Sequence, residues 1–269
     1  MYKRLSCYII FALAVLCIVY TSSLRGVPTI GAVVQTWRYD AATNNVIATI
    51  VNTSDKDITA FNLTITETFA DHGVRTHEVL VDMLDTLLLL QRVKGTSDED
   101  RVRKDVGDGV LVARRSRDQV FSYPEGKVVT DFSATVDVVA YADNTAESVN
   151  APALARIREH RNAELHSHQK ASEIIKTVLL DSSITSPSQE AATRLEKFLA
   201  VWKGQSHSSG LDFDPGSIES VARDLKDASR IATAQGLSEM GFLQKYVAEK
   251  DQYIAFLSTH NQLKTGGVQ

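Results

Sequence analysis

Cysteine is almost absent from this chain of 269 residues. The two cysteines, Cys7 and Cys17, both lie near the N-terminus, in a segment that has the features of an export signal. If that segment is removed, the remaining chain contains no cysteine and cannot form a disulfide bond. We therefore expect the fold to depend on its hydrophobic core, for which a hydrophobic fraction of 43% is ordinary.

The chain also lacks an excess of basic residues. It has 29 Lys and Arg against 33 Asp and Glu, which gives a net charge of −4. Proteins that bind nucleic acids usually carry a basic face, and the short basic run over 114–117 contains no aromatic residue. We predict no nucleic-acid partner.

Recognisable catalytic and metal-binding motifs are missing as well. His77 and Glu78 begin like the zinc-protease helix motif, but Val81 stands where the second histidine is required. The "GQSHS" segment at 204–208 lacks the final glycine of a nucleophile elbow, and no phosphate-loop motif is found. The sequence therefore predicts no catalytic, cofactor-binding or metal-binding residue, no cofactor, and a protein that is not an enzyme.

Three polar residues, His160, Glu164 and His168, would share one ridge of a helix because they are four residues apart. At a rise of about 1.5 Å per residue, the two histidines would lie about 12 Å apart. That distance is too long for one zinc ion, whose bonds to nitrogen are about 2.0 Å. We interpret the ridge as a solvated, charged helix face.

The N-terminal segment is the least globular part of the sequence. Lys3 and Arg4 precede an apolar run of 16 residues over 5–20, and small polar residues follow. This order is typical of an export signal, and the run is slightly shorter than the 17–25 residues of a membrane-spanning helix. We predict that residues 1–23 are a signal peptide or, if uncleaved, a membrane anchor. Either reading places the remaining chain outside the cytoplasm: periplasmic, secreted, or anchored to the inner membrane, with membrane contact only through residues 5–20.

Residues 28–149 are predicted to be mainly β-structure. In "NTSDKDITAFNLTITETF" (52–69), a polar turn precedes a strict alternation that places Phe61, Leu63, Ile65 and Phe69 on one face. Glu67 interrupts that face, and we expect its carboxylate to emerge at the rim of the sheet. Further strands are expected at 33–39, 46–51, 110–114, 120–123 and 128–141. Strands of this length, separated by polar turns, favour an antiparallel β-sandwich.

Two segments depart from this β-pattern. Apolar residues recur at helical spacing between Val79 and Leu88, which predicts a helix inserted over about 76–92. The charged segment 94–108, with glycines around it, is predicted to be a mobile loop.

Residues 150–262 are predicted to be a helical region. Helix-start signals occur at Asn150, Ser186-Pro187, Asp214-Pro215 and Ser238. They indicate about four helices, over 151–181, 187–203, 215–235 and 238–259, followed by a disordered tail at 263–269. The expected fold class is therefore α+β, with an N-terminal sandwich followed by helices.

The β-region resembles the immunoglobulin-like sandwich domains of uncharacterised bacterial secreted and envelope proteins. The residues that carry the resemblance are "NTSDKDITAFNLTI" (52–65) and "VDVVAYADNTAE" (136–147). Asn144 stands where such proteins have a glycine, and asparagine tolerates positive φ better than most residues. The resemblance covers about residues 30–160. It implies an immunoglobulin-like fold and an envelope setting, and it supplies no catalytic residue.

These observations favour a non-catalytic extracytoplasmic protein, a binding or structural module that acts through an unknown protein partner or through self-association. One alternative is an extracytoplasmic hydrolase whose site is assembled from distant residues. Its candidates are the His160/Glu164 pair or the acidic residues Asp98, Glu99 and Asp100, and a pocket containing a buried carboxylate or histidine would favour it. A second alternative is a membrane-anchored scaffold, if residues 5–20 are retained.

Overall fold

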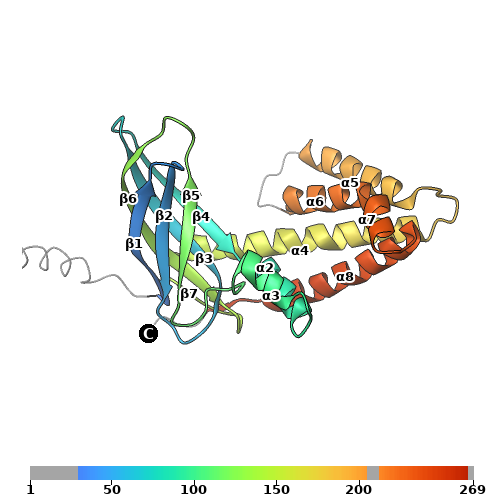
Figure 1. The fold of residues 1–269 in the computed structure, drawn as a ribbon, viewed down its shortest axis with the longest axis horizontal. Coiled ribbons are helices and arrows are strands. Elements are labelled where there is room, and N and C mark those ends of the chain that lie inside the picture. The colour runs from blue at the N-terminus through green and yellow to red at the C-terminus, as the bar shows by residue number, and fades with distance from the viewer. Residues whose placement is uncertain (1–29, 205–211, 266–269) are drawn as a thin grey trace, which may run out of the picture.

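The computed structural model describes residues 30–204 and 212–265. The predicted signal or anchor segment, most of the 204–208 motif and the last four residues of the predicted tail lie outside this part of the chain. The described fold is α+β, with two β-sheets and seven helices. In Figure 1 the sheets form one end of the molecule and helices α4 to α8 the other, with α2 and α3 beside their junction.

The first sheet is antiparallel and has three strands. In spatial order they are β1 (Ala32–Asp40), β2 (Asn45–Asn52) and β5 (Ser116–Ser122). The second sheet has five strands. It is a mixed sheet, because its last pair of neighbouring strands is parallel and the other pairs are antiparallel. In spatial order they are β4 (Val74–Asp82), β3 (Ile58–Phe69), β6 (Val129–Tyr141), β7 (Thr145–Ser148) and β8 (Lys264–Thr265).

The largest hydrophobic cluster draws its residues from both sheets. The predicted inward face of β3 is confirmed, since Phe61, Leu63 and Ile65 are fully buried. They belong to the same cluster as Ala48 and Ile50 of β2. Alternation with period two explains this arrangement, because every second side chain of a strand points to the same face.

The expectation for Glu67 was wrong, because its side chain is buried instead of emerging at the rim. The carboxylate accepts hydrogen bonds from the Tyr123 hydroxyl and from Arg75 Nε, the latter at 2.9 Å. Arg75 Nη2 also lies 2.8 Å from Glu67 Oε2. A buried carboxylate is tolerated when it is paired in this way, and neither partner is adjacent to Glu67 in the sequence.

The predicted helical insert over 76–92 was partly wrong. Residues 74–82 form strand β4, which pairs with β3 from Thr68 opposite Val74 to Ala60 opposite Asp82. Helix α2 (Leu84–Val93) begins only afterwards, and Asp82 Oδ1 accepts a hydrogen bond from Leu84 N at its start. The apolar residues assigned to one helix face therefore divide between a strand and a helix.

Two neighbouring predictions also need correction. The segment 94–108 contains helix α3 (Glu99–Val106), in which Arg103 pairs with Glu99 at 3.2 Å. In the expected strand over 110–114, only Leu111 forms an isolated bridge, to Ile58. Arg114 has a φ of 59°, a left-handed conformation that a strand does not accommodate.

The helical region is built around one long helix. Its described elements are α4 (Ala151–Leu179), α5 (Pro187–Lys203), α6 (Pro215–Lys226), α7 (Ala228–Ala234) and α8 (Glu239–His260). The predicted caps Asn150, Asp214 and Ser238 accept hydrogen bonds from backbone N–H groups in the first turns of α4, α6 and α8. The helix expected over 215–235 is divided at Asp227, after which α7 packs against α8.

Residues 264–265 were predicted to belong to a disordered tail, but they form β8. Lys264 N donates to the carbonyl oxygen of Asn144 at 2.8 Å, and β8 pairs in parallel with β7. Arg158 Nη2 donates to the Leu263 carbonyl at 2.9 Å. Through these contacts, the segment that follows α8 pairs with the five-stranded sheet.

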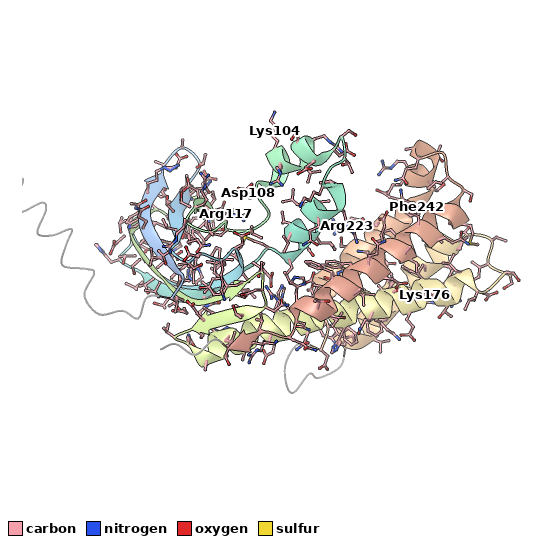
Figure 2. The ribbon with its side chains drawn as sticks, turned by 90° about the horizontal axis from the view of Figure 1, so that it is seen from below. Lys104, Asp108, Arg117, Lys176, Arg223 and Phe242 are labelled. Carbon is pink, nitrogen blue, oxygen red and sulfur yellow. The ribbon has the colours of Figure 1, made fainter. Side chains whose placement is uncertain are left out.

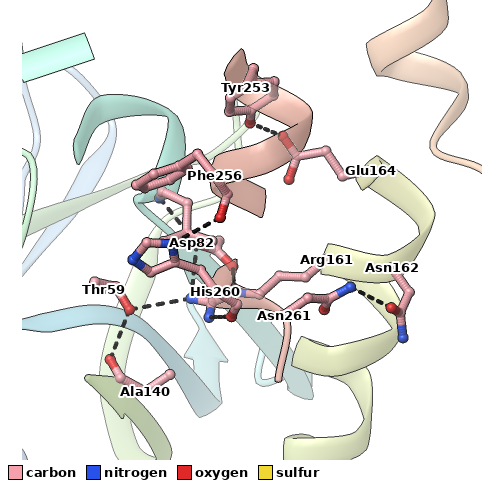
Figure 3. Close-up of polar contacts among 11 residues, drawn as sticks. Thr59, Asp82, Ala140, Arg161, Asn162, Glu164, Tyr253, Phe256, His260 and Asn261 are labelled. Carbon is pink, nitrogen blue, oxygen red and sulfur yellow. Dashed lines mark hydrogen bonds and ion pairs between the residues drawn. The ribbon is translucent and has the colours of Figure 1, made fainter. Parts of the chain in front are cut away.

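The sheets and the helices are joined through Arg161 of α4, whose side chain is fully buried. Its Nε donates to Asp82 Oδ2 at 2.7 Å, its Nη1 to the His260 carbonyl at 3.0 Å and its Nη2 to Thr59 Oγ1 at 3.3 Å (Figure 3). One side chain thus connects β3, the end of β4, α4 and α8. In the described parts of the chain, no helix combines the length and the apolar character needed to cross a membrane.

Candidate binding cleft

A cleft of about 530 Å³ opens where α2 meets the helical region, and residues of α2, α4, α6 and α8 line it. In Figure 2, α2 and α3 stand between the sheets and the helices. Helix α2 is held against α8 by a buried apolar cluster of Leu84, Leu88, Tyr253 and Leu257. This packing leaves Asp85, the neighbour of Leu84, on the wall of the cleft.

Glu164 of α4 lies behind the cleft wall and is only 7% exposed. The Tyr253 hydroxyl donates a hydrogen bond to Glu164 Oε1 (Figure 3). Burial, followed by the negative charges of Asp85 and Asp82, raises the pKa of the Glu164 carboxyl to about 9. Glu164 therefore holds a proton at neutral pH, and this carboxyl group hydrogen-bonds to Asp85.

His168 lies one helical turn beyond Glu164 and lines the cleft. Its ring packs edge-on against Tyr253 with centroids 4.7 Å apart, and its Nε2 is 3.9 Å from Glu164 Oε1. The side chain is 6% exposed, and its Nδ1 is buried without a hydrogen-bond partner. Burial lowers the pKa of His168 to about 3, with a smaller effect from the charge of Lys250. The imidazole is therefore neutral and retains an unused ring nitrogen.

Two cations line the cleft, Lys250 of α8 and Arg92 of α2. Lys250 Nζ lies 5.3 Å from the centroid of the Tyr246 ring and 6.0 Å from that of the Tyr253 ring. Burial is the main cause that lowers the pKa of Lys250. Arg92 Nη2 donates to the Glu249 carbonyl at 2.7 Å. Among the described residues, no carboxylate lies within ion-pair distance of either cation.

The α6 side of the cleft is anchored by Asp214. Its carboxylate caps the helix by accepting hydrogen bonds from Gly216 N at 3.1 Å and Ser217 N at 3.0 Å. Ser167 of α4 fixes the same turn, because Asp214 N donates to its Oγ at 2.8 Å. Further along α6, Asp224 Oδ2 accepts from the Tyr246 hydroxyl at 3.0 Å. Asp214 therefore has a structural role, whereas Asp224 retains one free carboxylate oxygen.

The structure corrects the interpretation of the His160, Glu164 and His168 ridge. We expected a solvated face, but Glu164 and His168 are buried because α2 and α8 pack against this side of α4. Only His160 is half-exposed. No group of three or more His, Cys, Asp or Glu side chains in the described ranges is arranged to hold a metal ion.

The other hydrolase candidates do not join this site. Asp98, Glu99 and Asp100 lie at the start of α3 and do not line the cleft. Asp98 pairs with Arg101 at 3.2 Å within that segment. His77 and Glu78, which resembled part of a zinc motif, lie on strand β4.

Sequence reasoning missed Asp85, Arg92, Lys250 and Tyr253. They come from two helices about 160 residues apart in the sequence, so no short motif contains them. Asp85, Arg92 and Lys250 lie beside apolar residues of amphipathic helices, where a charged side chain is usually solvated. The only local signal was the polar spacing of Glu164 and His168 on α4.

Comparison with known proteins adds little to this description. No protein-family model matches the chain, and no curated protein matches it. Among solved structures, the chain is similar to a hypothetical protein from Peptoclostridium difficile 630, with a TM-score of 0.28 and 10% identity. That similarity covers 48% of this chain and 91% of the other. A likeness this weak carries no inference about fold or function.

Proposed function

We propose that this is a non-catalytic extracytoplasmic binding protein whose binding site is the cleft between α2 and the helical region. The observation that carries the proposal is the cleft itself, which is lined by His168, a buried residue whose Nδ1 has no hydrogen-bond partner in the described structure. Buried polar atoms without a partner are rare in folded proteins and call for an explanation. A ligand that hydrogen-bonds to this nitrogen would supply one.

The size and chemistry of the cleft support a small ligand. Its volume of about 530 Å³ falls within the range of about 300–1,000 Å³ that is usual for small-molecule sites. Lys250 and Arg92 offer N–H donors, and Asp85 and Asp224 offer acceptors. The predicted protein partner or self-association remains a separate proposal, for which the edge strand β4 offers a route by strand addition.

The proposal also includes the fold of the two sheets and the cellular location of the protein. We infer that the two sheets form an immunoglobulin-like sandwich, which the shared cluster of β2 and β3 side chains supports. The resemblance of residues 30–160 to bacterial envelope proteins and the export-like segment 1–23 favour a periplasmic or secreted location. N-terminal sequencing of the protein from fractionated cells tests this proposal. A start after residue 23 supports cleavage, and an intact N-terminus in the membrane fraction supports an anchored scaffold.

One observation favours a second candidate, an extracytoplasmic hydrolase. Glu164 holds a proton at neutral pH beside the cleft, as a general acid must. Glu164 does not itself line the cleft, however, because Asp85, His168 and Tyr253 do so in front of it. A substrate would therefore meet Asp85 first, and binding is the function that the geometry supports better.

The proposal can be tested with a variant that fills the cleft. Ser220 is exposed on α6, lines the cleft and has no side-chain hydrogen bond in the described structure. Ser220→Trp should occupy the cleft without disturbing the core. Ser229→Trp is the matched control, since Ser229 is exposed on α7 and lies outside the cleft.

Thermal unfolding of the three proteins is measured against a library of small polar compounds. We expect at least one compound to raise the unfolding temperature of the wild type and of Ser229→Trp but not of Ser220→Trp. If every stabilising compound acts equally on Ser220→Trp, the cleft is not the binding site and the proposal is wrong.

A further inference from the structure

The charges that line the cleft are of both signs, and the described structure does not pair them with each other. Lys250 has three N–H donors, and in the described structure its Nζ lies over the faces of Tyr246 and Tyr253 without a hydrogen-bond partner. Arg92 uses one N–H on the Glu249 carbonyl, which leaves most of its donors free. The negative charges of Asp224 and Asp85 favour the charged form of Lys250, and the smaller effect of Arg92 disfavours it. An anionic group that contacts Lys250 and Arg92 would use donors that no carboxylate of the described structure reaches.

The carboxylates Asp85 and Asp224 also line the cleft without a direct ion pair in the described part of the chain. Asp85 lines the cleft beside the protonated carboxyl group of Glu164, and the charge of Lys250 favours the ionised form of Asp85. Asp224 accepts one hydrogen bond, from the neutral Tyr246 hydroxyl. Within the described residues, neither carboxylate has a Lys or Arg at ion-pair distance. A cationic group that contacts either carboxylate would form a direct ion pair, which no Lys or Arg of the described structure makes with them.

His168 provides an independent reason to place a ligand here. Its side chain is more than nine-tenths buried, lines the cleft and keeps Nδ1 unpartnered. Charged residues on a protein surface are often simply solvated, whereas this buried ring nitrogen is not satisfied by the surrounding protein in the described structure. This nitrogen marks the cleft as a site for a hydrogen-bonding molecule.

Building on the proposed binding function, we propose that the ligand is a small zwitterion, an amino acid or short peptide with a free ammonium and a free carboxylate. Its carboxylate binds Arg92 and Lys250, and its ammonium binds Asp85 and Asp224. A polar group of the ligand reaches His168 Nδ1. A purely anionic ligand would leave Asp85 and Asp224 without a direct ion pair, and a purely cationic ligand would leave Arg92 and Lys250 without one.

The test uses calorimetric titration of the wild type with a panel of amino acids and dipeptides. Each binding compound is compared with its N-acetylated form, which lacks the ammonium, and its C-amidated form, which lacks the carboxylate. We expect the zwitterion to bind at least about tenfold more tightly than either derivative. Equal binding of either derivative would overturn the inference.

Two variants test which side chains of the protein bind the carboxylate and the ammonium of the ligand. In Lys250→Met, the preference for the free carboxylate over the amide should fall to about onefold, and in Asp85→Asn the preference for the free ammonium should fall similarly. Lys245→Met is the matched control, because Lys245 is exposed on the same helix and does not line the cleft. If Lys250→Met and Lys245→Met retain the same preference, the carboxylate does not bind Lys250 and the inference is wrong.

The same titrations separate this inference from the proposed function. If a compound that is not a zwitterion binds and Ser220→Trp abolishes its binding, the cleft is a binding site and only the zwitterion proposal fails. If nothing binds the wild type in the cleft, both proposals fail.

Discussion

Replacing Glu164 with glutamine tests whether the carboxyl behind the cleft is protonated. The amide is nearly the same shape, cannot ionise and keeps an oxygen that accepts the Tyr253 hydroxyl. In the wild type, the folded state retains a proton that the unfolded chain releases, because the pKa of Glu164 rises from 4.5 to about 9 on folding. The contribution of Glu164 to stability is therefore complete below about pH 4.5 and is lost as the pH rises towards 9.

The size of this effect follows from the pKa difference. One pKa unit corresponds to about 1.4 kcal/mol, so retaining the proton at pH 7 costs about 3 kcal/mol in the free energy of unfolding. The Glu164→Gln variant does not incur this cost. Its stability advantage over the wild type should therefore grow by about 1.4 kcal/mol for each pH unit between pH 5 and pH 8.

The lowered pKa of His168 changes the free energy of unfolding with pH in the opposite direction. The comparison of the wild type with Glu164→Gln must cancel this effect. Because this pKa is lowered to about 3, the buried ring destabilises the folded state as the pH falls below 6.5 and has no such effect above it. Both proteins contain His168, so the difference between them at pH 7 to 8 reports mainly on Glu164.

The assay is urea unfolding followed by circular dichroism at pH 5, 6, 7 and 8. Glu159→Gln is the matched control, since Glu159 is an exposed residue of the same helix. We expect a pH-dependent advantage for Glu164→Gln and none for Glu159→Gln. A constant difference between Glu164→Gln and the wild type, or a wild type that is more stable at pH 8, would refute the reasoning.

Three further predictions concern stability. Arg161→Met should destabilise the protein by about 3–5 kcal/mol in urea unfolding, because it leaves the Asp82 carboxylate without its buried partner; a second change, Asp82→Asn, should restore part of this loss, and no restoration would argue against the pairing. Phe61→Ala should cost about 3–5 kcal/mol by removing a fully buried ring from the cluster shared by the sheets, and a loss below about 1 kcal/mol would contradict that burial. Asp214→Ala should cost about 1 kcal/mol, since it removes the cap of α6; Asp214→Asn, which keeps an acceptor oxygen, should cost less.

The elements that the sequence predicted well are those that local pattern determines. The alternation of Phe61, Leu63 and Ile65 defines the inner face of β3 without reference to any other strand. Caps such as Asp214 are equally local, because the side chain bonds to N–H groups two and three residues later. Both features were therefore predictable from the sequence alone.

The errors arose where distant partners decide the outcome. The segment 74–82 has apolar residues at helical spacing, but pairing with β3 makes it a strand. Glu67 can be buried because Arg75 of β4 and Tyr123, which follows β5, donate hydrogen bonds to its carboxylate. Neither partner is visible in the local pattern around the residue.

The cleft could be predicted only in part, for the same reason. The spacing of Glu164 and His168 was recognised, and its interpretation as a solvated face was wrong because α2 and α8 cover that side of α4. Lys250 and Asp85 line the same cleft only because α2 packs on α8. A sequence pattern does not indicate which charged helix face another helix will cover.

The central claim is that the cleft between α2 and the helical region is where this protein binds its ligand. Two-dimensional NMR spectra of isotope-labelled protein, recorded with and without the tightest zwitterion of the panel, test it most directly. The account predicts that the largest amide shifts occur at Asp85, His168, Ser220, Lys250 and Tyr253. Shifts confined to the sheets, or to the separate groove between α5 and α6 that Leu199 and Ile218 line, would contradict it.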